Sequence, residues 1–174
     1  ISPGKHGRIH RDKYMAKGEP MPVCIVVGTD PLSFLTSSTE APEGMCELDM
    51  MGAYRGHAVE CVTGKHTGLP FPAASEVVIE GFIHPGNTAP EGPFGEWLGY
   101  QGGRMEAEPW VDVSAIYHRN DPILLGAAHI RLPYEYARYR AISRSAILKE
   151  NISRAGVPDV TEVWAHEVGG SRLF

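Results

Sequence analysis

Short runs of apolar, mostly β-branched residues recur along the first three quarters of the 174-residue chain. The clearest run, residues 22–31 (PVCIVVGTDP), is continuous and ends at Gly28, Asp30 and Pro31. Such a run is typical of a buried strand followed by a turn. The same reasoning predicts strands at residues 57–62, 75–84, 110–119 and 122–128, with Asn120-Asp121-Pro122 as the turn between the last two.

Two segments carry apolar residues at helical spacing instead. Residues 46–56 (CELDMMGAYRG) predict a helix that ends at Gly56. Residues 134–156 predict a much longer helix that ends at Gly156, and residues 157–165 (VPDVTEVWA) predict one further strand. The predicted order is therefore a helix among many strands, then one long helix, then a strand.

This order of elements predicts an α+β fold. Adjacent strands with hairpin-length connections favour a mostly antiparallel sheet or a small barrel over a doubly wound parallel sheet. The chain shows no internal repeat, no low-complexity tract and no obvious linker. We therefore expect residues 1–174 to form a single domain.

The composition narrows the classes of function. With 43% hydrophobic and 21% charged residues, the chain is expected to form the core of one soluble domain. A formal net charge of -5 without a basic run argues against a nucleic-acid or membrane-surface partner. No apolar stretch approaches the roughly 18–20 residues that span a bilayer. Three cysteines without a CxxC pattern favour a reducing, cytoplasmic setting.

Candidate chemistry concentrates in residues 86–100 (GNTAPEGPFGEWLGY). Glu91 and Glu96 flank a Gly-Pro-Phe-Gly spacer, which predicts a shaped loop, neither helix nor ordinary strand, with Phe94 as its anchor. Two acids held near a pocket can divide the roles of proton donor and charge partner, because desolvation raises the pKa of one carboxyl while the other stays ionised. The alternative is a pair of solvated acids on a hairpin.

Local sequence leaves two possible roles open for each of three further residues. His6, beside Lys5 and four residues before His10, is either a metal or phosphate contact or part of a basic surface cluster. Glu47, at the start of a predicted helix, either complements the helix dipole or serves as an oxygen ligand for Mg²⁺ or Mn²⁺. His129 follows a run of small and apolar residues and is either half-buried with a backbone partner or a substrate contact.

Residues 72–100 (PAASEVVIEGFIHPGNTAPEGPFGEWLGY) closely resemble the signature of the UbiD family of reversible decarboxylases. In that signature P-A-x-x-E-[IV]-V-[IL]-E-G is followed by P-E-G-P-[FY]-G-[ED]. Further segments also resemble the family: residues 1–10 (ISPGKHGRIH), 46–62 (CELDMMGAYRGHAVECV) and 154–164 (RAGVPDVTEVW). The resemblance covers essentially the whole chain and implies an FMN-binding split β-barrel.

The resemblance also implies roles for individual residues. The two acids of the family motif fall on Glu91, which in the family pairs with an arginine, and on Glu96, which donates the proton that replaces departing CO₂. In the family's metal site Mn²⁺ bridges to the cofactor phosphate with K⁺ nearby. Its histidine falls on His6 and its glutamate on Glu47. The backbone of Lys5 is implied to lie against the cofactor.

The function implied by the resemblance is reversible, non-oxidative decarboxylation of an aromatic, heteroaromatic or α,β-unsaturated carboxylic acid with prenylated FMN. By the same resemblance His129 lies on the substrate side of the flavin. An imidazole there can hydrogen-bond a ring hydroxyl, which favours a hydroxylated or heteroaromatic acid. Two rival interpretations stay open: an FMN-dependent oxidoreductase on a similar barrel, and a folded piece without catalysis.

Some of the family's groups fall outside this sequence. The arginine that pairs with the first glutamate and the asparagine that completes the metal site lie upstream of the first matching segment. We therefore expect either a segment of a longer polypeptide, which an opening at Ile1 without a start methionine also favours, or a second chain that supplies those groups. The 174 residues alone are expected to be inactive, and the complete protein is expected to be a dimeric or hexameric homo-oligomer.

Overall fold

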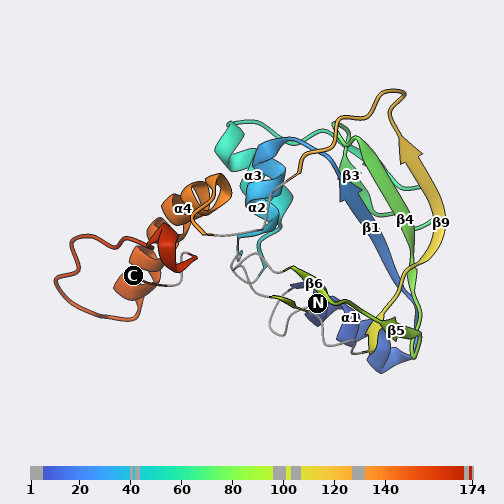
Figure 1. Cartoon of the computed structure of the whole chain (residues 1–174), viewed down its shortest axis with the longest axis horizontal. Coiled ribbons are helices and arrows are strands. Elements are labelled where there is room, and N and C mark those ends of the chain that lie inside the picture. The colour runs from blue at the N-terminus through green and yellow to red at the C-terminus, as the bar shows by residue number, and fades with distance from the viewer. Residues whose placement is uncertain are drawn as a thin grey trace.

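The computed structural model describes residues 6–39, 41, 44–95, 101–102, 107–126, 132–170 and 173 (Figure 1). The helices are α1 (His6–Lys17), α2 (Pro31–Ser37), α3 (Glu47–Arg55) and α4 (Glu135–Arg154), with a short 3-10 helix, η1 (Glu167–Gly169). The strands are β1 (Met21–Val27), β2 (Cys61–Thr63), β3 (Pro70–Pro72), β4 (Val77–Ile83), β5 (Thr88–Pro90), β6 (Phe94–Gly95), β7 (Gln101–Gly102), β8 (Ala107–Pro109) and β9 (Asp112–His118).

The largest sheet is antiparallel, with the strand order β1–β4–β9. Its register aligns Ile25, Ile79 and Ile116 across the three strands. The other described strands form three antiparallel pairs, β2–β3, β5–β8 and β6–β7. The predicted mostly antiparallel α+β fold with one long helix is confirmed. The argument from hairpin-length connections is wrong for the main sheet, because α2, α3 and the β2–β3 pair intervene between β1 and β4.

Helix α2 begins at a turn that the hydrophobic pattern indicates only as the end of a strand. The Asp30 carboxylate accepts a hydrogen bond from the backbone N–H of Leu32 at 2.8 Å. Pro31 occupies the start of the helix, where its missing N–H is not needed. The guanidinium of Arg55, at the end of α3, lies 2.5 Å from the same carboxylate. Asp30 therefore both starts α2 and ties it to α3.

Apolar packing is divided between the sheet and the long helix. Met51 of α3, Phe71 of β3 and Val78 of β4 are buried, and the Phe71 ring stacks on Tyr117 of β9 with 6.1 Å between centroids. Helix α4 lies at the opposite end of the molecule from this sheet, with α2 and α3 between them (Figure 1). It packs through small side chains such as Ala137. Two modest clusters therefore replace one large core.

The strand predicted at residues 122–128 is not found in its described part. Pro122 carries no N–H, and the N–H of Ile123 donates to the carboxylate of Glu76 at 3.1 Å rather than to a neighbouring strand. Residues 122–126 therefore have no regular secondary structure. Apolar composition alone gave the wrong prediction, because a strand also needs a partner.

The strand predicted at residues 157–165 is also wrong. This segment is held against α4, where the backbone N–H of Ala165 donates to the Ser145 hydroxyl at 2.9 Å. Asp159 within it adopts a positive φ of 59°, which regular strands exclude. The strand predicted at residues 57–62 is much shorter than expected and forms only at its end, as β2.

The hydrophobic pattern does not predict α1. Its sequence, HGRIHRDKYMAK, is mostly polar and charged and has no continuous apolar stripe by which an amphipathic helix is recognised, and none of its residues is buried. Among the described residues, no helix is long and apolar enough to cross a lipid bilayer.

Candidate functional site

The structure brings together His6 and Glu47, two residues that are distant in sequence and that the family resemblance assigns to one metal site. The Nδ1 atom of His6 lies 3.3 Å from Oε1 of Glu47. The two residues are the first of helices α1 and α3, respectively. Their side chains are 32% and 36% exposed, so the pair is half-buried and open to a ligand.

The separation of these two atoms suits a shared divalent ion. Neighbouring ligands of an octahedral ion, each about 2.1 Å from the metal, lie roughly 3 Å apart. Imidazole nitrogen and carboxylate oxygen are both accepted by first-row divalent metals. Within the described part of the chain, no group of three or more His, Cys, Asp or Glu side chains could hold a metal. The pair is therefore not a complete metal site by itself; its spacing suits two neighbouring ligands, and the remaining ligands would have to come from outside the described residues.

Glu47 also lines a cavity of about 460 Å³. Its walls include Cys24 and Val26 from β1, Phe34 from α2 and Met51 from α3. The volume lies within the range of small-molecule and cofactor sites, which are mostly apolar with a few polar groups. Glu47 thus stands at the wall of a space that a small molecule can enter.

One polar atom in this cavity wall lacks a partner. The hydroxyl oxygen of Thr29 is buried and makes no hydrogen bond with the described part of the protein. A buried hydroxyl without a partner costs about 1–3 kcal/mol, so a ligand that supplied a hydrogen bond here would be favoured. The cavity therefore fits a ligand with both apolar and polar surface, which is the character of a flavin mononucleotide.

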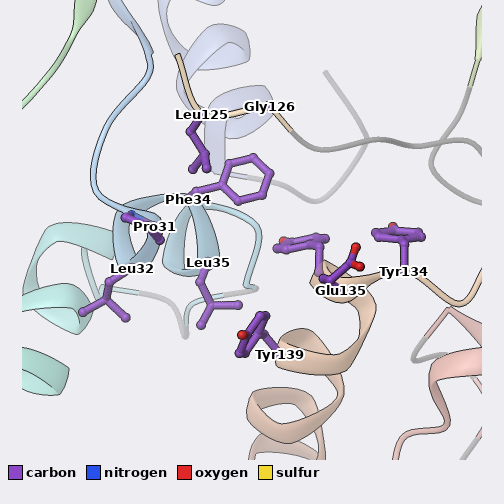
Figure 2. A pocket seen from close by; sticks show the side chains of 10 residues that line it. Pro31, Leu32, Phe34, Leu35, Leu125, Gly126, Tyr134, Glu135 and Tyr139 are labelled. Carbon is purple, nitrogen blue, oxygen red and sulfur yellow. The ribbon is translucent and has the colours of Figure 1, made fainter. Parts of the chain in front are cut away.

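A second cavity of about 360 Å³ lies beside the first, and both include Phe34 and Leu125 in their walls. Figure 2 shows Phe34 and Leu35 projecting from α2 towards α4, which contributes Tyr139. The ring centroids of Phe34 and Tyr136 are 4.9 Å apart. The second cavity is thus lined mainly by aromatic and aliphatic side chains, with the carboxylate of Glu135 also in its wall.

Local sequence reasoning missed a fully buried carboxylate, that of Glu80 in the middle of β4. Its Oε1 accepts hydrogen bonds from the backbone N–H groups of His66 and Thr67 at 2.9 and 2.6 Å, and from the Thr67 hydroxyl at 2.7 Å. Its Oε2 accepts a hydrogen bond from the Tyr117 hydroxyl at 2.7 Å. The available signal was one acid inside the apolar run of residues 77–83.

These hydrogen bonds keep Glu80 ionised. Burial by itself raises the pKa of Glu80, but the hydrogen bonds from Thr67, Tyr117 and His66 stabilise the charged form and lower the pKa to about 2. The Thr67 hydroxyl also lies 3.5 Å from Sγ of Cys24, a residue of the cavity that Glu47 lines. Glu80 therefore anchors the turn between β2 and β3 to the sheet beside that cavity.

The other predicted site residues are less defined. Glu91 is exposed in the loop between β5 and β6. Phe94 was expected to anchor this loop, but it is 41% exposed, so its ring is not packed in the protein interior as an anchor would be. Lys5, Glu96 and His129 lie outside the described residues. The structure thus brings together the two predicted metal ligands and leaves the predicted acid pair untested.

Comparison with known proteins identifies the family of this chain. The model of the UbiD family, described as the 3-octaprenyl-4-hydroxybenzoate carboxy-lyase Rift-related domain, matches residues 1–131. An uncharacterized protein of Synechocystis sp. is 36% identical over 150 residues, which make up 84% of this chain and 30% of that protein.

Solved structures match almost the whole chain. An evolved dimeric form of the UbiD-class enzyme HmfF from Pelotomaculum thermopropionicum, in complex with prFMN, gives a TM-score of 0.85 at 30% identity over 99% of this chain and 39% of that one. Apo 3,4-dihydroxybenzoic acid decarboxylase from Klebsiella pneumoniae gives 0.78 at 30% identity over 98% and 37%. Vanillic acid decarboxylase from Sedimentibacter hydroxybenzoicus, in open form, gives 0.75 at 29% identity over 93% and 35%. The chain thus spans less than two fifths of the length of these proteins.

Proposed function

The chain belongs to the UbiD family, and on that premise we propose that it is the flavin- and metal-binding part of a carboxy-lyase. The proposed reaction is the reversible, non-oxidative decarboxylation of an aromatic, heteroaromatic or α,β-unsaturated carboxylic acid. The observation that carries the proposal is the 3.3 Å approach of His6 Nδ1 to Glu47 Oε1. The family resemblance assigns these two residues to one site without any knowledge of the fold.

The residues of this chain would hold the metal and the cofactor phosphate together. His6 and Glu47 would bind Mn²⁺, with K⁺ nearby, and the backbone of Lys5 would lie against the cofactor. The Thr29 hydroxyl, which has no hydrogen-bond partner within the described part of the protein, offers a hydrogen bond in the cavity that Glu47 lines. When bound, prenylated FMN supplies the electron sink that the loss of CO₂ requires, which no side chain of the protein can supply.

Glu96 and Glu91 carry the proton chemistry in this proposal. Glu96 delivers one proton to the carbon from which CO₂ departs. Glu91 pairs with an arginine supplied from outside the 174 residues, and that cation orients the substrate carboxylate. Their placement in one short Gly-Pro-containing segment supports a shared site.

The substrate class is proposed from the neighbours and from His129. Two similar structures are those of decarboxylases of 3,4-dihydroxybenzoic acid and vanillic acid, both hydroxylated benzoic acids. We place His129 at a ring hydroxyl of such a substrate, because neutral and protonated imidazole both offer an N–H donor. A cinnamic-type hydrocarbon acid would leave this polar group unpaired, at a cost of roughly 1–3 kcal/mol.

Retention of metal and cofactor in the complete protein tests the metal site. We expect His6→Ala and Glu47→Ala to lose bound Mn²⁺, measured by elemental mass spectrometry, and bound flavin, measured by absorbance. His10→Ala and Asp49→Ala are matched controls, because they are exposed positions on the same two helices. Full metal and flavin occupancy in both site variants would refute the assignment.

Turnover tests the reaction and the proton donor. With reconstituted prenylated FMN, we expect CO₂ release from 3,4-dihydroxybenzoate or vanillate to exceed that from cinnamate, and His129→Ala to weaken this preference. Glu96→Gln and Glu91→Gln should each lower turnover by about 10²–10⁴-fold while flavin stays bound. Near-normal rates in Glu96→Gln would exclude it as the proton donor. Nicotinamide oxidation without CO₂ release would favour the oxidoreductase alternative.

We also propose that the complete protein is a homo-oligomer, a dimer or a hexamer. Support comes from HmfF, whose evolved form is dimeric. Light scattering on the complete protein measures this directly. Co-purification of a second, different chain that supplies the missing arginine and asparagine is the alternative outcome.

A further inference from the structure

A small cavity between the end of α2 and the middle of α4 has two arginines in its wall. Its volume is about 70 Å³, and it shares no lining residue with the two cavities described above. Helix α4 contributes Arg140 and Arg144, and the two residues that follow α2 contribute hydroxyl groups. We call this cavity the arginine pocket. Its described lining contains no carboxylate and consists of Ser38, Thr39, Arg140, Ser143, Arg144, Ile147, Leu148 and Asn151.

One hydrogen-bond donor of the arginine pocket is buried without a partner. The Nε atom of Arg144 is shielded from solvent and makes no hydrogen bond with the described part of the protein. A guanidinium group stays charged in proteins, and a buried charged donor without an acceptor is unfavourable. Arg140 precedes Arg144 by four residues, so the two cations share one face of α4, where like charges repel. A negatively charged acceptor would satisfy both conditions.

The backbone at the end of α2 cannot easily supply this acceptor. Carbonyl oxygens at the end of a helix are ordinary partners for a cation. The carbonyl oxygen of Leu35, however, already accepts hydrogen bonds from the hydroxyls of Ser38 and Thr39, at 2.7 and 2.9 Å. The next carbonyl, that of Thr36, accepts from the backbone N–H groups of the same two residues. A carbonyl oxygen has two lone pairs, so both oxygens are fully used.

The volume and the donors of the arginine pocket suit one small oxyanion. A water molecule takes up roughly 30 Å³ in the liquid, so the cavity has room for about two waters or one tetrahedral oxyanion, and not for a nucleotide. The planar fork of a guanidinium group matches two oxygens of a phosphate. The exposed amide of Asn151 offers two further N–H donors. Two guanidinium groups in the wall favour a dianion over a singly charged carboxylate.

We propose that the arginine pocket binds a free inorganic oxyanion of the size and charge of phosphate, held by the guanidinium of Arg144 with that of Arg140 beside it. The ion joins the end of α2 to α4 and adds to the packing of Phe34 on Tyr136, whose ring centroids are 4.9 Å apart. This site is separate from the cavity that Glu47 lines, so it is not the proposed position of the cofactor phosphate. It is also independent of the proposed reaction.

Calorimetric titration of the complete protein with inorganic phosphate tests the site. Saturating FMN keeps phosphate out of the cofactor site, and sodium chloride holds the ionic strength constant. We expect wild type to bind phosphate and Arg144→Gln to bind it about 10-fold or more weakly, because a charged hydrogen-bond donor is lost. Arg154→Gln is the matched control, since Arg154 lies on the same helix, is 72% exposed and pairs with Glu150. Equal weakening in the two variants, or no phosphate binding by wild type, would overturn the proposal.

A panel of anions on the wild-type protein tests the size and charge of the ligand. Sulfate should bind within a few-fold of phosphate. Acetate should bind about 10-fold or more weakly because it carries one charge, and glycerol 3-phosphate should do the same because the cavity has no room for its carbon chain. Acetate or glycerol 3-phosphate binding as tightly as phosphate would overturn the assignment to a free dianion.

A direct measurement of position does not depend on any variant. Crystals of the complete wild-type protein soaked in selenate, a heavier analogue of sulfate, should show anomalous density beside the guanidinium of Arg144. Soaked crystals without density at this place would refute the site.

Discussion

Two carboxylates of this chain, Glu80 and Glu47, meet opposite physical conditions. Glu80 is fully buried and accepts hydrogen bonds from His66, Thr67 and Tyr117. Glu47 is 36% exposed and, within the part of the chain that the structure describes, pairs with His6 alone. A buried charge must find its partners inside the protein, because water cannot supply them. A half-exposed pair leaves coordinating capacity for a ligand.

The difference assigns the two carboxylates to different tasks. The carboxylate of Glu80 forms its hydrogen bonds with other residues of the protein, so replacing Glu80 should lower the free energy of unfolding. The interactions of Glu47 are incomplete, so its removal should affect binding and leave the fold almost unchanged. The four predictions below test this division, in order of decreasing expected effect.

Replacing Glu80 by alanine should give the largest effect. The variant leaves the donors of His66, Thr67 and Tyr117 buried without an acceptor, and hydrogen bonds to charged groups contribute roughly 1.5–3 kcal/mol each, although not additively. We expect the free energy of unfolding to fall by about 3 kcal/mol or more, measured by urea denaturation. Glu150→Ala is the control, since Glu150 and its partner Arg154 are 62% and 72% exposed. Equal losses in the two variants would contradict a special role for Glu80.

The free energy of unfolding should also depend on pH through the titration of Glu80. The pKa of Glu80 is about 2 in the folded protein, below its ordinary value of 4.5. Its contribution is therefore fully present above about pH 5 and is lost as the pH falls from 4.5 towards 2. We expect Glu80→Gln to flatten the stability curve in this window, measured as urea midpoints at stepped pH. An unchanged slope would show that Glu80 does not titrate there.

Tyr117→Phe should have a smaller effect of the same kind. It removes one donor to Glu80 and keeps the ring that stacks on Phe71. Because that donor helps to lower the pKa of Glu80, we expect its removal to move this pKa back towards 4.5, so the loss of stability between pH 4.5 and 2 should be smaller than in wild type. Tyr54→Phe, at a 56% exposed ring, should leave the acid transition unchanged. Identical acid transitions in all three proteins would contradict the network.

Glu47→Ala should have the smallest effect on the fold itself. Partly exposed ion pairs contribute about 0–1 kcal/mol, so the metal-free variant should unfold within that range of wild type. Added Mn²⁺ should raise the melting temperature of wild type and of Asp49→Ala by mass action, and should not raise that of Glu47→Ala. A large loss of stability without metal would make Glu47 a structural residue like Glu80.

The elements with a strong local signal could be predicted from the sequence. The apolar runs at β1, β4 and β9 and the helical spacing in α3 and α4 were sufficient. Gly56 and Gly156, predicted to end two helices, have φ values of 76° and 79° just beyond them. Helix α1 has no apolar stripe, and α2 is only seven residues long, so periodicity could not reveal either one.

The wrong strands share a physical cause. Residues 122–126 and 157–165 have the composition of strands, but a strand exists only where another backbone accepts its hydrogen bonds. Ile123 instead donates to the Glu76 side chain, and Ala165 donates to the Ser145 hydroxyl. Local composition contains no information about which partner is within reach.

Sequence by itself determined the α+β class and the family signature, because these depend on residue types at short spacings. The resemblance to the family, and not local spacing, singled out His6 and Glu47 as metal-ligand candidates. Only the tertiary structure decided that His6 and Glu47 stand 3.3 Å apart and that Glu80 is buried and ionised. Each of these facts is a contact, or the lack of one, between segments far apart in the chain. Such contacts are set by how α1, α3 and the sheet pack together, which local propensity does not encode.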